Sequence, residues 1–244
     1  MIGIFDSGSG GLSVLAALKK RAPNLDVVYF GDLANMPYGG RSQENLRELT
    51  VLGFEILRAA GATQLVSACN SVSAAVVRPF MHGEGVIEMV GPAARELARR
   101  GLRRVAIVAT PATVESGIYE TACAELGVAA SMIAVSGLAA AIELENFDAV
   151  RAEISLVAEK ILDLDVEAVL LGCTHYPFAR HVFEKFLEGK NIEIIDPADG
   201  VAEEIVEKCG VDGNGELKIL ISTPSEIFEA RVQKLFGNSQ IVHS

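Results

Sequence analysis

Residues 2–21, IGIFDSGSGGLSVLAALKKR, decide the fold, because an apolar run gives way there to a glycine-rich loop and then to a helical pattern. Ile2–Asp6 has the length and apolar character of a buried strand. Leu12–Arg21 repeats apolar residues at the spacing of an amphipathic helix. A strand that leads through a loop into a helix predicts the first part of a βαβ unit, and therefore a parallel sheet.

The same alternation continues along the rest of the chain. Further strands are expected at Val27–Gly31, Gln64–Ala68, Val86–Val90, Val105–Ala109, Val169–Leu171, Ile192–Ile195 and Lys218–Ile221. Further helices are expected at Gln43–Ala60, Ala93–Arg100, Val114–Leu126 and Ala149–Leu162. This order predicts an α/β fold with mostly parallel sheets. In such folds, ligands bind at the carboxyl ends of the strands, so the functional residues are expected there.

A weak internal repeat predicts two related α/β domains. Each half holds an apolar strand and, at a similar spacing, a second strand that ends in a small residue, a cysteine and a polar residue. The two cysteines are Cys69 and Cys173. One break is expected near Gly91-Pro92, where a predicted strand ends and a helix begins. A second is expected near Asp196-Pro197, because proline ends the preceding run and restricts the residue before it. We expect one domain to comprise residues 1–91 plus 200–244 and the other residues 92–199, with the two cysteines meeting across the cleft between them.

The composition excludes several classes of protein. The 244 residues carry a net charge of −11 and show no basic stripe, which argues against partners that are nucleic acids or anionic membranes. No apolar run reaches the roughly 18 residues of a membrane span, and the N-terminus lacks the features of a signal peptide. The four cysteines are far apart, which favours reduced thiols in the cytoplasm over a disulfide framework or a zinc site.

Cys69 and Cys173 are the first candidates for chemistry. Each follows an apolar strand and precedes polar residues that are expected to begin a helix. Backbone N–H groups and the positive end of a helix stabilise a thiolate there, which lowers the pKa of the thiol. The alternative is that both are small apolar residues buried at strand ends. Cys123 and Cys209 lie in helical patterns and are interpreted as packing residues.

Polar residues beside the cysteines add donors. Asn70-Ser71 and Thr174-His175 can bind a carboxylate, although Asn, Ser and Thr are also the usual N-cap residues. The loop Asp6-Ser7-Gly8-Ser9-Gly10-Gly11 resembles a phosphate-binding loop but lacks the Lys-Ser/Thr ending of the P-loop. Its aspartate would repel phosphate and suits an ammonium group or a proton relay. A plain turn between strand and helix is the alternative.

Three more segments carry weaker signals. Residues 32–41, DLANMPYGGR, form a long polar loop of the kind that recognises ligands, or a plain connection. Thr110-Pro-Ala-Thr113 ends a predicted strand and either meets the ligand or caps a helix. Glu143 lies in an apolar stretch and, taken alone, is interpreted as a surface charge.

The segments IGIFDSGSGGLSVL, VYFGDLANMPYGGRS, ACNSVSA, VAIVATPATVESGIY and LGCTHYP resemble, in this order, the glutamate racemases of the aspartate/glutamate racemase superfamily. The resemblance implies two pseudosymmetric α/β domains with the active site at their interface, and no pyridoxal phosphate, other cofactor or metal. It also implies interconversion of L- and D-glutamate, with the D-form supplied for peptidoglycan. A cytoplasmic homodimer is expected.

Carried onto this sequence, the resemblance makes Cys69 and Cys173 the two catalytic bases, with Asp6 supporting the first and His175 the second. Glu143 matches an acidic residue of the active site. Substrate contacts are implied for Asp6, Ser7, Pro37, Tyr38, Gly39, Asn70, Ser71, Thr113, Thr174 and His175. Three serines depart from the usual pattern: Ser71 stands in place of threonine, and Ser67 and Ser9 in place of aliphatic residues.

The chemistry agrees with this assignment, because one base does not easily reach both faces of a Cα. Racemisation therefore needs two groups on opposite walls, one a thiolate and one a thiol. The alternatives are a racemase for another amino acid such as aspartate, or a non-catalytic amino-acid-binding regulator on the same scaffold. Thiol redox chemistry is disfavoured because neither cysteine has a neighbouring cysteine in sequence.

Overall fold

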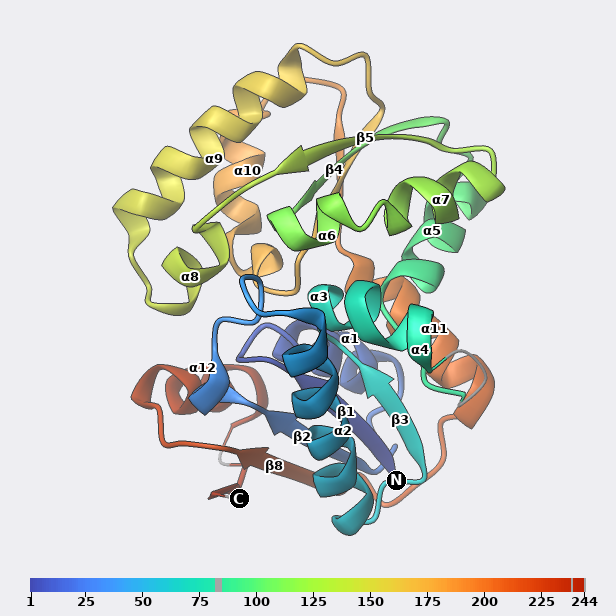
Figure 1. Ribbon diagram of the computed structural model, residues 1–244, viewed down its shortest axis with the longest axis vertical. Coiled ribbons are helices and arrows are strands. Elements are labelled where there is room, and N and C mark those ends of the chain that lie inside the picture. The colour runs from blue at the N-terminus through green and yellow to red at the C-terminus, as the bar shows by residue number, and fades with distance from the viewer. Residues whose placement is uncertain (82–84, 238, 244) are drawn as a thin grey trace.

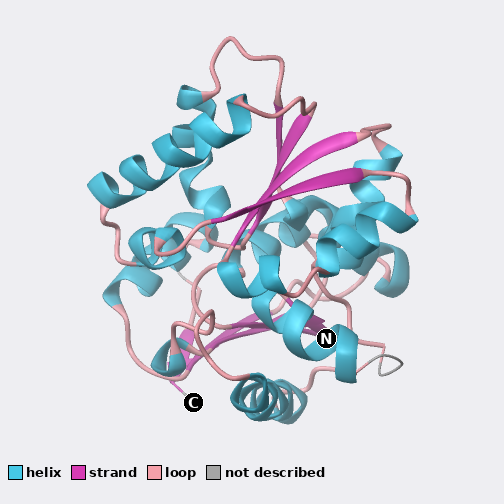
Figure 2. Ribbon diagram, turned by 45° about the horizontal axis from the view of Figure 1, so that its top comes forward, coloured by secondary structure: helices cyan, strands magenta, loops and turns pink. Residues whose placement is uncertain are grey.

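The structure is a computed structural model, and it describes residues 1–81, 85–237 and 239–243. It contains two sheets, one above the other in Figure 1, with helices on both faces of each (Figure 2). Every pair of neighbouring strands is parallel. The predicted α/β fold with parallel sheets is therefore confirmed. No helix in the described part of the chain combines the length and apolar character of a membrane span.

The first sheet has the strand order β3-β1-β2-β8-β9 and the second the order β5-β4-β6-β7. The first comprises β1 (Ile2–Asp6), β2 (Val27–Gly31), β3 (Gln64–Ser67), β8 (Leu217–Ile221) and β9 (Ile241–His243). The second comprises β4 (Arg104–Ala109), β5 (Ala129–Ala134), β6 (Ala168–Gly172) and β7 (Glu193–Ile195). Although β8 and β9 come from the C-terminal end of the chain, β8 pairs with β2 and completes the first sheet.

Helices bury both faces of the first sheet, so successive residues of β1 enter different cores. Ile4 packs into the core shared with α1, α11 and α12, and Phe5 packs into the core shared with α2. This is the alternation expected of a strand. The helices that surround this sheet are α1 (Leu12–Arg21), α2 (Gln43–Ala59), α11 (Pro197–Cys209) and α12 (Glu226–Phe236), with the short elements η1 (Leu33–Asn35), α3 (Asn70–Val72), the π-helical η2 (Ser73–Val77) and α4 (Arg78–Phe80).

The second sheet is built in the same way. One core contains residues of α8, α9 and α10, and the other contains residues of α5 and α7. The helices that surround this sheet are α5 (Val90–Arg99), α6 (Pro111–Glu115), α7 (Ile118–Glu125), α8 (Leu138–Glu143), α9 (Phe147–Leu162), the 3₁₀ helix η3 (Tyr176–Ala179) and α10 (Arg180–Phe186).

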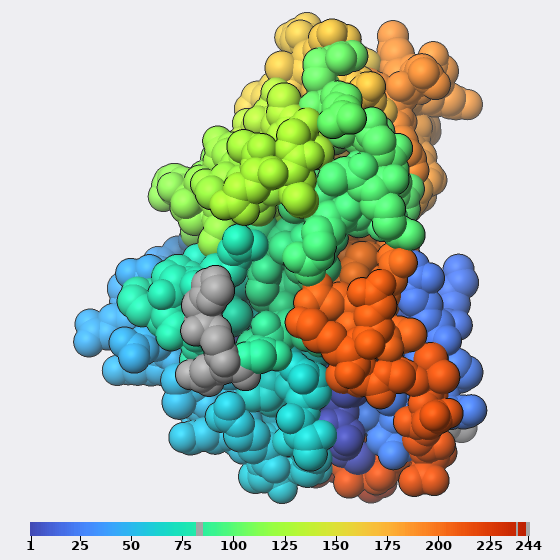
Figure 3. Space-filling view, turned by 90° about the vertical axis from the view of Figure 1, so that its right-hand side faces the viewer, coloured from blue at the N-terminus to red at the C-terminus, as the bar shows by residue number. Residues whose placement is uncertain are grey.

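The two sheets are joined by α5 and α11, which pack against each other. Figure 3 shows them at the waist of the molecule, the green segment of α5 beside the orange segment of α11. Arg95 pairs with Glu204, and Arg99 with Glu203, across this contact. The expected domain boundaries at 91/92 and 199/200 fall inside these two helices, and the division into domains stays a prediction.

Two sequence predictions are wrong in detail. Val86–Val90 is not a strand: Ile87 forms an isolated bridge with Val66, and α5 already begins at Val90. The helix begins there because the Glu88 carboxylate accepts hydrogen bonds from the amides of Val90 and Gly91. The helix expected over 114–126 is divided into α6 and α7 by Gly117, whose φ of 64° lies in the left-handed region that favours glycine.

Candidate active site

A cavity of ≈ 550 Å³ lies between the loops that follow the strands of the two sheets. Cys69 enters it from the end of β3 and Cys173 from the end of β6, so the structure brings the two predicted thiols to one site. The other predicted residues that line it are Ser7, Pro37, Tyr38, Gly39, Asn70, Ser71, Glu143, Thr174 and His175. Asp6 and Thr113 are fully buried and are not among the lining residues.

Cys69 is the N-cap residue of α3, as its position before a helix predicts. Its Sγ lies 3.4 Å from the Ser7 hydroxyl. The expected fall in the pKa of this thiol is wrong. Burial, reinforced by the negative charge of Asp6, raises the pKa of Cys69 to about 12, because hydrogen bonds from Ser7 and from the Val72 amide are too weak to compensate. Cys69 is therefore a thiol at neutral pH in this environment.

Asp6 lies behind the cavity wall, at the end of β1. Its carboxylate accepts hydrogen bonds from the Gly8 amide at 2.8 Å and from the Thr174 hydroxyl at 3.3 Å, and it thus joins the loops of the two sheets. Burial raises the pKa of Asp6, and the positive charge of His175 and two backbone amides oppose this rise. Asp6 is placed to act through Cys69 and Thr174.

The second thiol belongs to a chain of three side chains. His175 Nδ1 lies 3.9 Å from Cys173 Sγ, and His175 Nε2 lies 2.9 Å from a carboxylate oxygen of Glu143. Burial lowers the pKa of His175, but its hydrogen bonds to Cys173 and Glu143 outweigh burial and raise the pKa to about 10. His175 is therefore an imidazolium at neutral pH. It can stabilise a thiolate at Cys173 or return a proton to it.

Glu143 is only 5 % exposed, so its interpretation as a surface charge is wrong. Burial raises the pKa of Glu143, but the hydrogen bonds from His175 and Ser9 and the charges of His175 and Arg231 lower it to about 2. The carboxylate is thus ionised throughout the neutral range, which is the form that His175 requires.

Asn70 presents an unused donor to the site. Its Oδ1 accepts a 2.6 Å hydrogen bond from the Tyr119 hydroxyl, whereas its buried Nδ2 has no protein partner. A buried amide N–H without a partner is costly, so Nδ2 is suited to bind an acceptor on a ligand. Tyr119 belongs to α7 beside the second sheet, so this hydrogen bond also crosses between the two halves of the chain.

The Thr113 hydroxyl, which was predicted to contact the substrate, does not line the cavity. Thr110 lines the cavity, and its Oγ1 lies 3.1 Å from Thr113 Oγ1 and 3.4 Å from the Ser71 hydroxyl. The donor that the threonine-rich strand end offers is therefore Thr110, with Thr113 as its partner. Sequence spacing alone does not distinguish the two.

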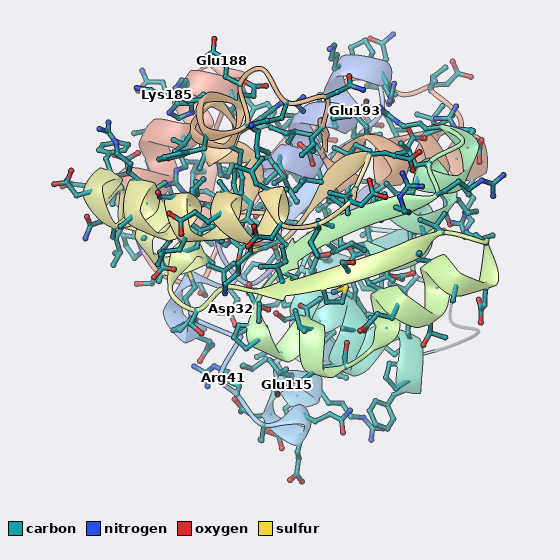
Figure 4. The ribbon with its side chains drawn as sticks, turned by 90° about the horizontal axis from the view of Figure 1, so that it is seen from above. Asp32, Arg41, Glu115, Lys185, Glu188 and Glu193 are labelled. Atoms are coloured by element: carbon teal, nitrogen blue, oxygen red, sulfur yellow. The ribbon has the colours of Figure 1, made fainter. Side chains whose placement is uncertain are left out.

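The loop after β2 forms another wall of the cavity through Pro37, Tyr38 and Gly39. Asp32 and Arg41 mark the two ends of this loop in Figure 4. The Tyr38 hydroxyl donates a 2.7 Å hydrogen bond to Asp32, and Arg41 donates to the Asn35 carbonyl. The sequence did not single out the role of Asp32. Asp32 accepts the hydrogen bond of the Tyr38 hydroxyl, so the loop backbone and the tyrosine ring are the surfaces that face a ligand.

The glycine-rich loop has a packing role that the resemblance to a phosphate loop did not predict. A Cβ on Gly10 would lie 2.5 Å from Thr174 Oγ1 and 2.7 Å from His175 Nδ1. Only glycine therefore lets the β1–α1 loop approach the loop after β6 so closely. The loop supports the Cys173 side of the cavity.

Two more residues that the sequence reasoning missed contact Glu143, namely Ser9 and Arg231. Arg231 carried a detectable signal. It occupies an apolar stripe of α12 beside Phe228 and Val232, where a buried arginine needs an acidic partner.

Cys123 and Cys209 pack against the hydrophobic cores, as predicted. Among the described residues, no three His, Cys, Asp or Glu side chains are grouped to hold a metal ion.

Comparisons with known proteins agree with this architecture. A glutamate racemase of Thermus thermophilus is 36 % identical over 96 % of this chain and 91 % of its own. The crystal structure of glutamate racemase isoform RacE1 from Bacillus anthracis is similar with a TM-score of 0.88 and 28 % identity, covering 100 % of this chain and 96 % of that one. The glutamate racemase of Francisella tularensis in complex with D-glutamate is similar with a TM-score of 0.84 and 25 % identity, covering 99 % and 95 % of the two chains.

The family match is equally extensive. Residues 4–205 match the sequence family described as Asp/Glu/Hydantoin racemase, and this range contains both cavity cysteines and every predicted site residue. The fold, the resemblance on which the sequence reasoning rested and the comparisons agree: this chain belongs to the Asp/Glu/hydantoin racemase family of amino-acid racemases.

Proposed function

We propose that this protein interconverts L- and D-glutamate by a two-base mechanism that uses no organic cofactor and no metal. The observation that carries the proposal is the meeting of Cys69 and Cys173, from loops of different sheets, at one cavity. One cysteine, as thiolate, removes the α-proton and becomes a thiol. The other, as thiol, delivers its own proton to the opposite face of Cα and becomes a thiolate.

The raised pKa of Cys69 favours a substrate that carries an ammonium group. Within the described part of the chain, the residues that line the cavity include no lysine or arginine. The only positive charge among these residues is that of His175, which is engaged by Cys173 and Glu143. The α-ammonium group of an amino acid therefore adds a positive charge on the side of Cys69. Its approach lowers the pKa of Cys69 from about 12 and makes the thiolate accessible.

Stabilisation of the developing charge falls to neutral donors. Removal of the α-proton spreads negative charge onto the α-carboxylate, which needs preorganised hydrogen-bond donors. Asn70 Nδ2 is the best placed of them because it is buried and unpartnered. The hydroxyls of Ser71, Thr110 and Thr174 line the same cavity. The relatives named as glutamate racemases support glutamate as the substrate.

Exchange in D₂O tests the proposal directly. Purified protein, treated with EDTA and with hydroxylamine to remove any metal or pyridoxal phosphate, is mixed with L- or D-glutamate and followed by proton NMR and chiral chromatography. We expect the α-proton to exchange and each enantiomer to convert into the other. Turnover of aspartate but not glutamate would move the assignment to another amino acid. Binding without turnover would leave a non-catalytic regulator, and a Cys69–Cys173 disulfide formed on mild oxidation would favour redox chemistry.

The biological setting rests on the resemblance alone. We propose that the D-glutamate supplies peptidoglycan synthesis in the cytoplasm and that the enzyme acts as a homodimer. Restored growth of a bacterium that requires external D-glutamate, upon expression of this chain, would support the first part. Sedimentation of the purified protein measures the second.

A further inference from the structure

The side chain of Arg231 reaches from the C-terminal helix α12 to the second half of the molecule. Its guanidinium group donates hydrogen bonds to the Ile142 carbonyl of α8 and, at 2.9 Å, to the Glu143 carboxylate. The group lies over the ring of Phe178, 5.1 Å from the ring centroid. Arg231 is 9 % exposed, so these contacts are screened little by solvent. It does not line the cavity.

Three hydrogen bonds converge on one carboxylate oxygen. Oε2 of Glu143 accepts hydrogen bonds from Ser9, from Arg231 and from His175 Nε2. Arg231 also donates to the Ser9 hydroxyl, so the serine lies between the cation and the anion. The three donors come from the β1–α1 loop, from α12 and from the loop after β6. The orientation of Glu143 is therefore fixed from three sides.

The charges explain what the arginine contributes. Asp6 and Glu143 are the buried carboxyl groups that interact electrostatically with each other and with His175. His175 carries one positive charge only while it is protonated, and the Cys173 thiol lies on its other side. Arg231 is permanently charged, so it balances Glu143 regardless of the state of His175.

We propose that Arg231, together with Ser9, is a positioning residue for catalysis: it keeps Glu143 ionised and aimed at His175, and so sets the protonation state of the Cys173 half of the site. This inference deepens the proposed function and rests on it. A serine at position 9, in place of the usual aliphatic residue, fits this arrangement because the Ser9 hydroxyl bridges Arg231 and Glu143.

Three variants separate charge from hydrogen bonding. Arg231→Met keeps the approximate length of the side chain and removes the charge, and Arg231→Lys keeps the charge. Ser9→Ala removes the two hydrogen bonds of the serine hydroxyl, to Glu143 and from Arg231, while leaving the charge of Arg231 intact. We expect Arg231→Met to lower kcat/KM about 10- to 100-fold, the effect of losing a charge-assisted hydrogen bond, and Arg231→Lys to recover most of it.

The pH dependence is the decisive readout. Without the guanidinium, one of the two positive charges that lower the pKa of Glu143 is gone and only that of His175 is left, so Glu143 takes up a proton at higher pH. We expect the acidic limb of the kcat/KM profile of Arg231→Met to move toward neutrality and that of Arg231→Lys to stay close to the wild type. Ser9→Ala should move the limb in the same direction as Arg231→Met, because the Ser9 hydroxyl also lowers the pKa of Glu143. A uniform loss of activity with an unchanged pH profile would mean that Arg231 only stabilises the fold, and would overturn the proposal.

A measurement without turnover distinguishes this inference from the proposed function. NMR of ¹⁵N-labelled histidine, with the His175 signal assigned from a His175→Asn variant, reports the pair directly. We expect the wild-type signal to stay that of an imidazolium between about pH 5 and 8, and the acid-side change that reports titration of Glu143 to occur at a higher pH in Arg231→Met than in the wild type. Identical titrations would refute the inference even if the wild type racemises glutamate. A difference would support it even if another amino acid is the substrate.

Discussion

The Tyr119 hydroxyl donates a 2.6 Å hydrogen bond to Oδ1 of Asn70, and this bond joins α7 beside the second sheet to α3 beside the first. This bond decides which end of the Asn70 amide faces a ligand. With Oδ1 engaged, Nδ2 is the end left free, and it is buried without a protein partner. Tyr119 therefore acts on the substrate through Asn70, which it aligns as a donor.

Tyr119→Phe tests this alignment. The variant leaves Oδ1 of Asn70 without its partner, which costs about 1–3 kcal/mol and lets the amide turn over. We expect kcat/KM for glutamate to fall about 10-fold and the free energy of unfolding to fall as well. Steady-state kinetics and urea denaturation measure the two effects.

Tyr176→Phe is the matched control, since the Tyr176 hydroxyl is also buried but has no partner. Its removal abolishes an unsatisfied group, so we expect unchanged activity and equal or higher stability. Equal losses in the two variants would show that the hydroxyl of Tyr119 contributes to packing and not to the orientation of Asn70.

The sequence alone predicts most of the strands but few of the contacts between side chains. Central strands such as β1, β2 and β6 are buried on both faces, so they appear as continuous apolar runs and were predicted. The two missed strands, β5 and β9, are the edges of their sheets. In β5 most residues are partly exposed and the run is rich in alanine, so neither burial nor β-propensity distinguishes it.

The residues of the candidate site also fall into a predictable and an unpredictable group. Cys69 and Cys173 were predictable because the carboxyl ends of parallel strands collect functional residues. The convergence of Ser9 and Arg231 on Glu143 was not, because it depends on how α12 docks over a loop 222 positions away in sequence. Sequence spacing also does not show that Thr110, rather than Thr113, lines the cavity.

Replacement of either cavity cysteine should end racemisation without ending proton exchange. Cys69→Ser and Cys173→Ser each leave one functional base, which still removes the α-proton of the enantiomer that presents it. We expect kcat for racemisation to fall by about 10²–10⁴ in each. In D₂O, each variant should exchange the α-proton of one enantiomer only, and the two variants should select opposite enantiomers.

Cys123→Ser is the control for these variants, because Cys123 is buried in a hydrophobic core away from the cavity. A hydroxyl placed there destabilises the fold and leaves the chemistry intact. Full racemisation by either cavity variant would exclude the two-base mechanism.

The stability of the protein should fall in alkaline solution because of His175 and Cys69. The pKa of His175 is raised from 6.5 to about 10, so the folded state holds a proton that the unfolded state releases. Its contribution is complete below pH 6.5 and is lost as the pH rises through 10. The pKa of Cys69 is raised from 9.0 to about 12, which adds a second loss above pH 9. Each group gives a slope of up to about 1.4 kcal/mol per pH unit.

Urea denaturation of the wild type and of His175→Asn between pH 6 and pH 9 measures the first loss. We expect the slope to flatten in His175→Asn and to persist in His181→Asn, which alters an exposed histidine. On the acid side the sign is opposite. The pKa of Glu143 is lowered to about 2, so its contribution is present above pH 4.5 and disappears as the pH falls toward 2.

Gly10→Ala should damage the Cys173 side of the site selectively. The new Cβ would lie 2.5 Å from Thr174 Oγ1 and 2.7 Å from His175 Nδ1, so one of the two loops must move. Movement of His175 lengthens its contacts with Cys173 and Glu143, which hold its pKa high. We expect a loss of kcat of about 10²-fold, since small misplacements of catalytic groups have effects of that size.

Gly200→Ala provides the comparison for Gly10→Ala. Its Cβ would meet the Pro92 carbonyl oxygen at 3.0 Å where α11 packs on α5, so it also strains a close approach, but at the waist of the molecule. If tight packing alone were at issue, the two variants would lose activity and stability in parallel. We expect instead that Gly200→Ala lowers the melting temperature with little change in kcat, and that Gly10→Ala lowers the pKa of His175 in NMR titrations. An unshifted His175 in Gly10→Ala would show that the loop has no part in holding that side chain.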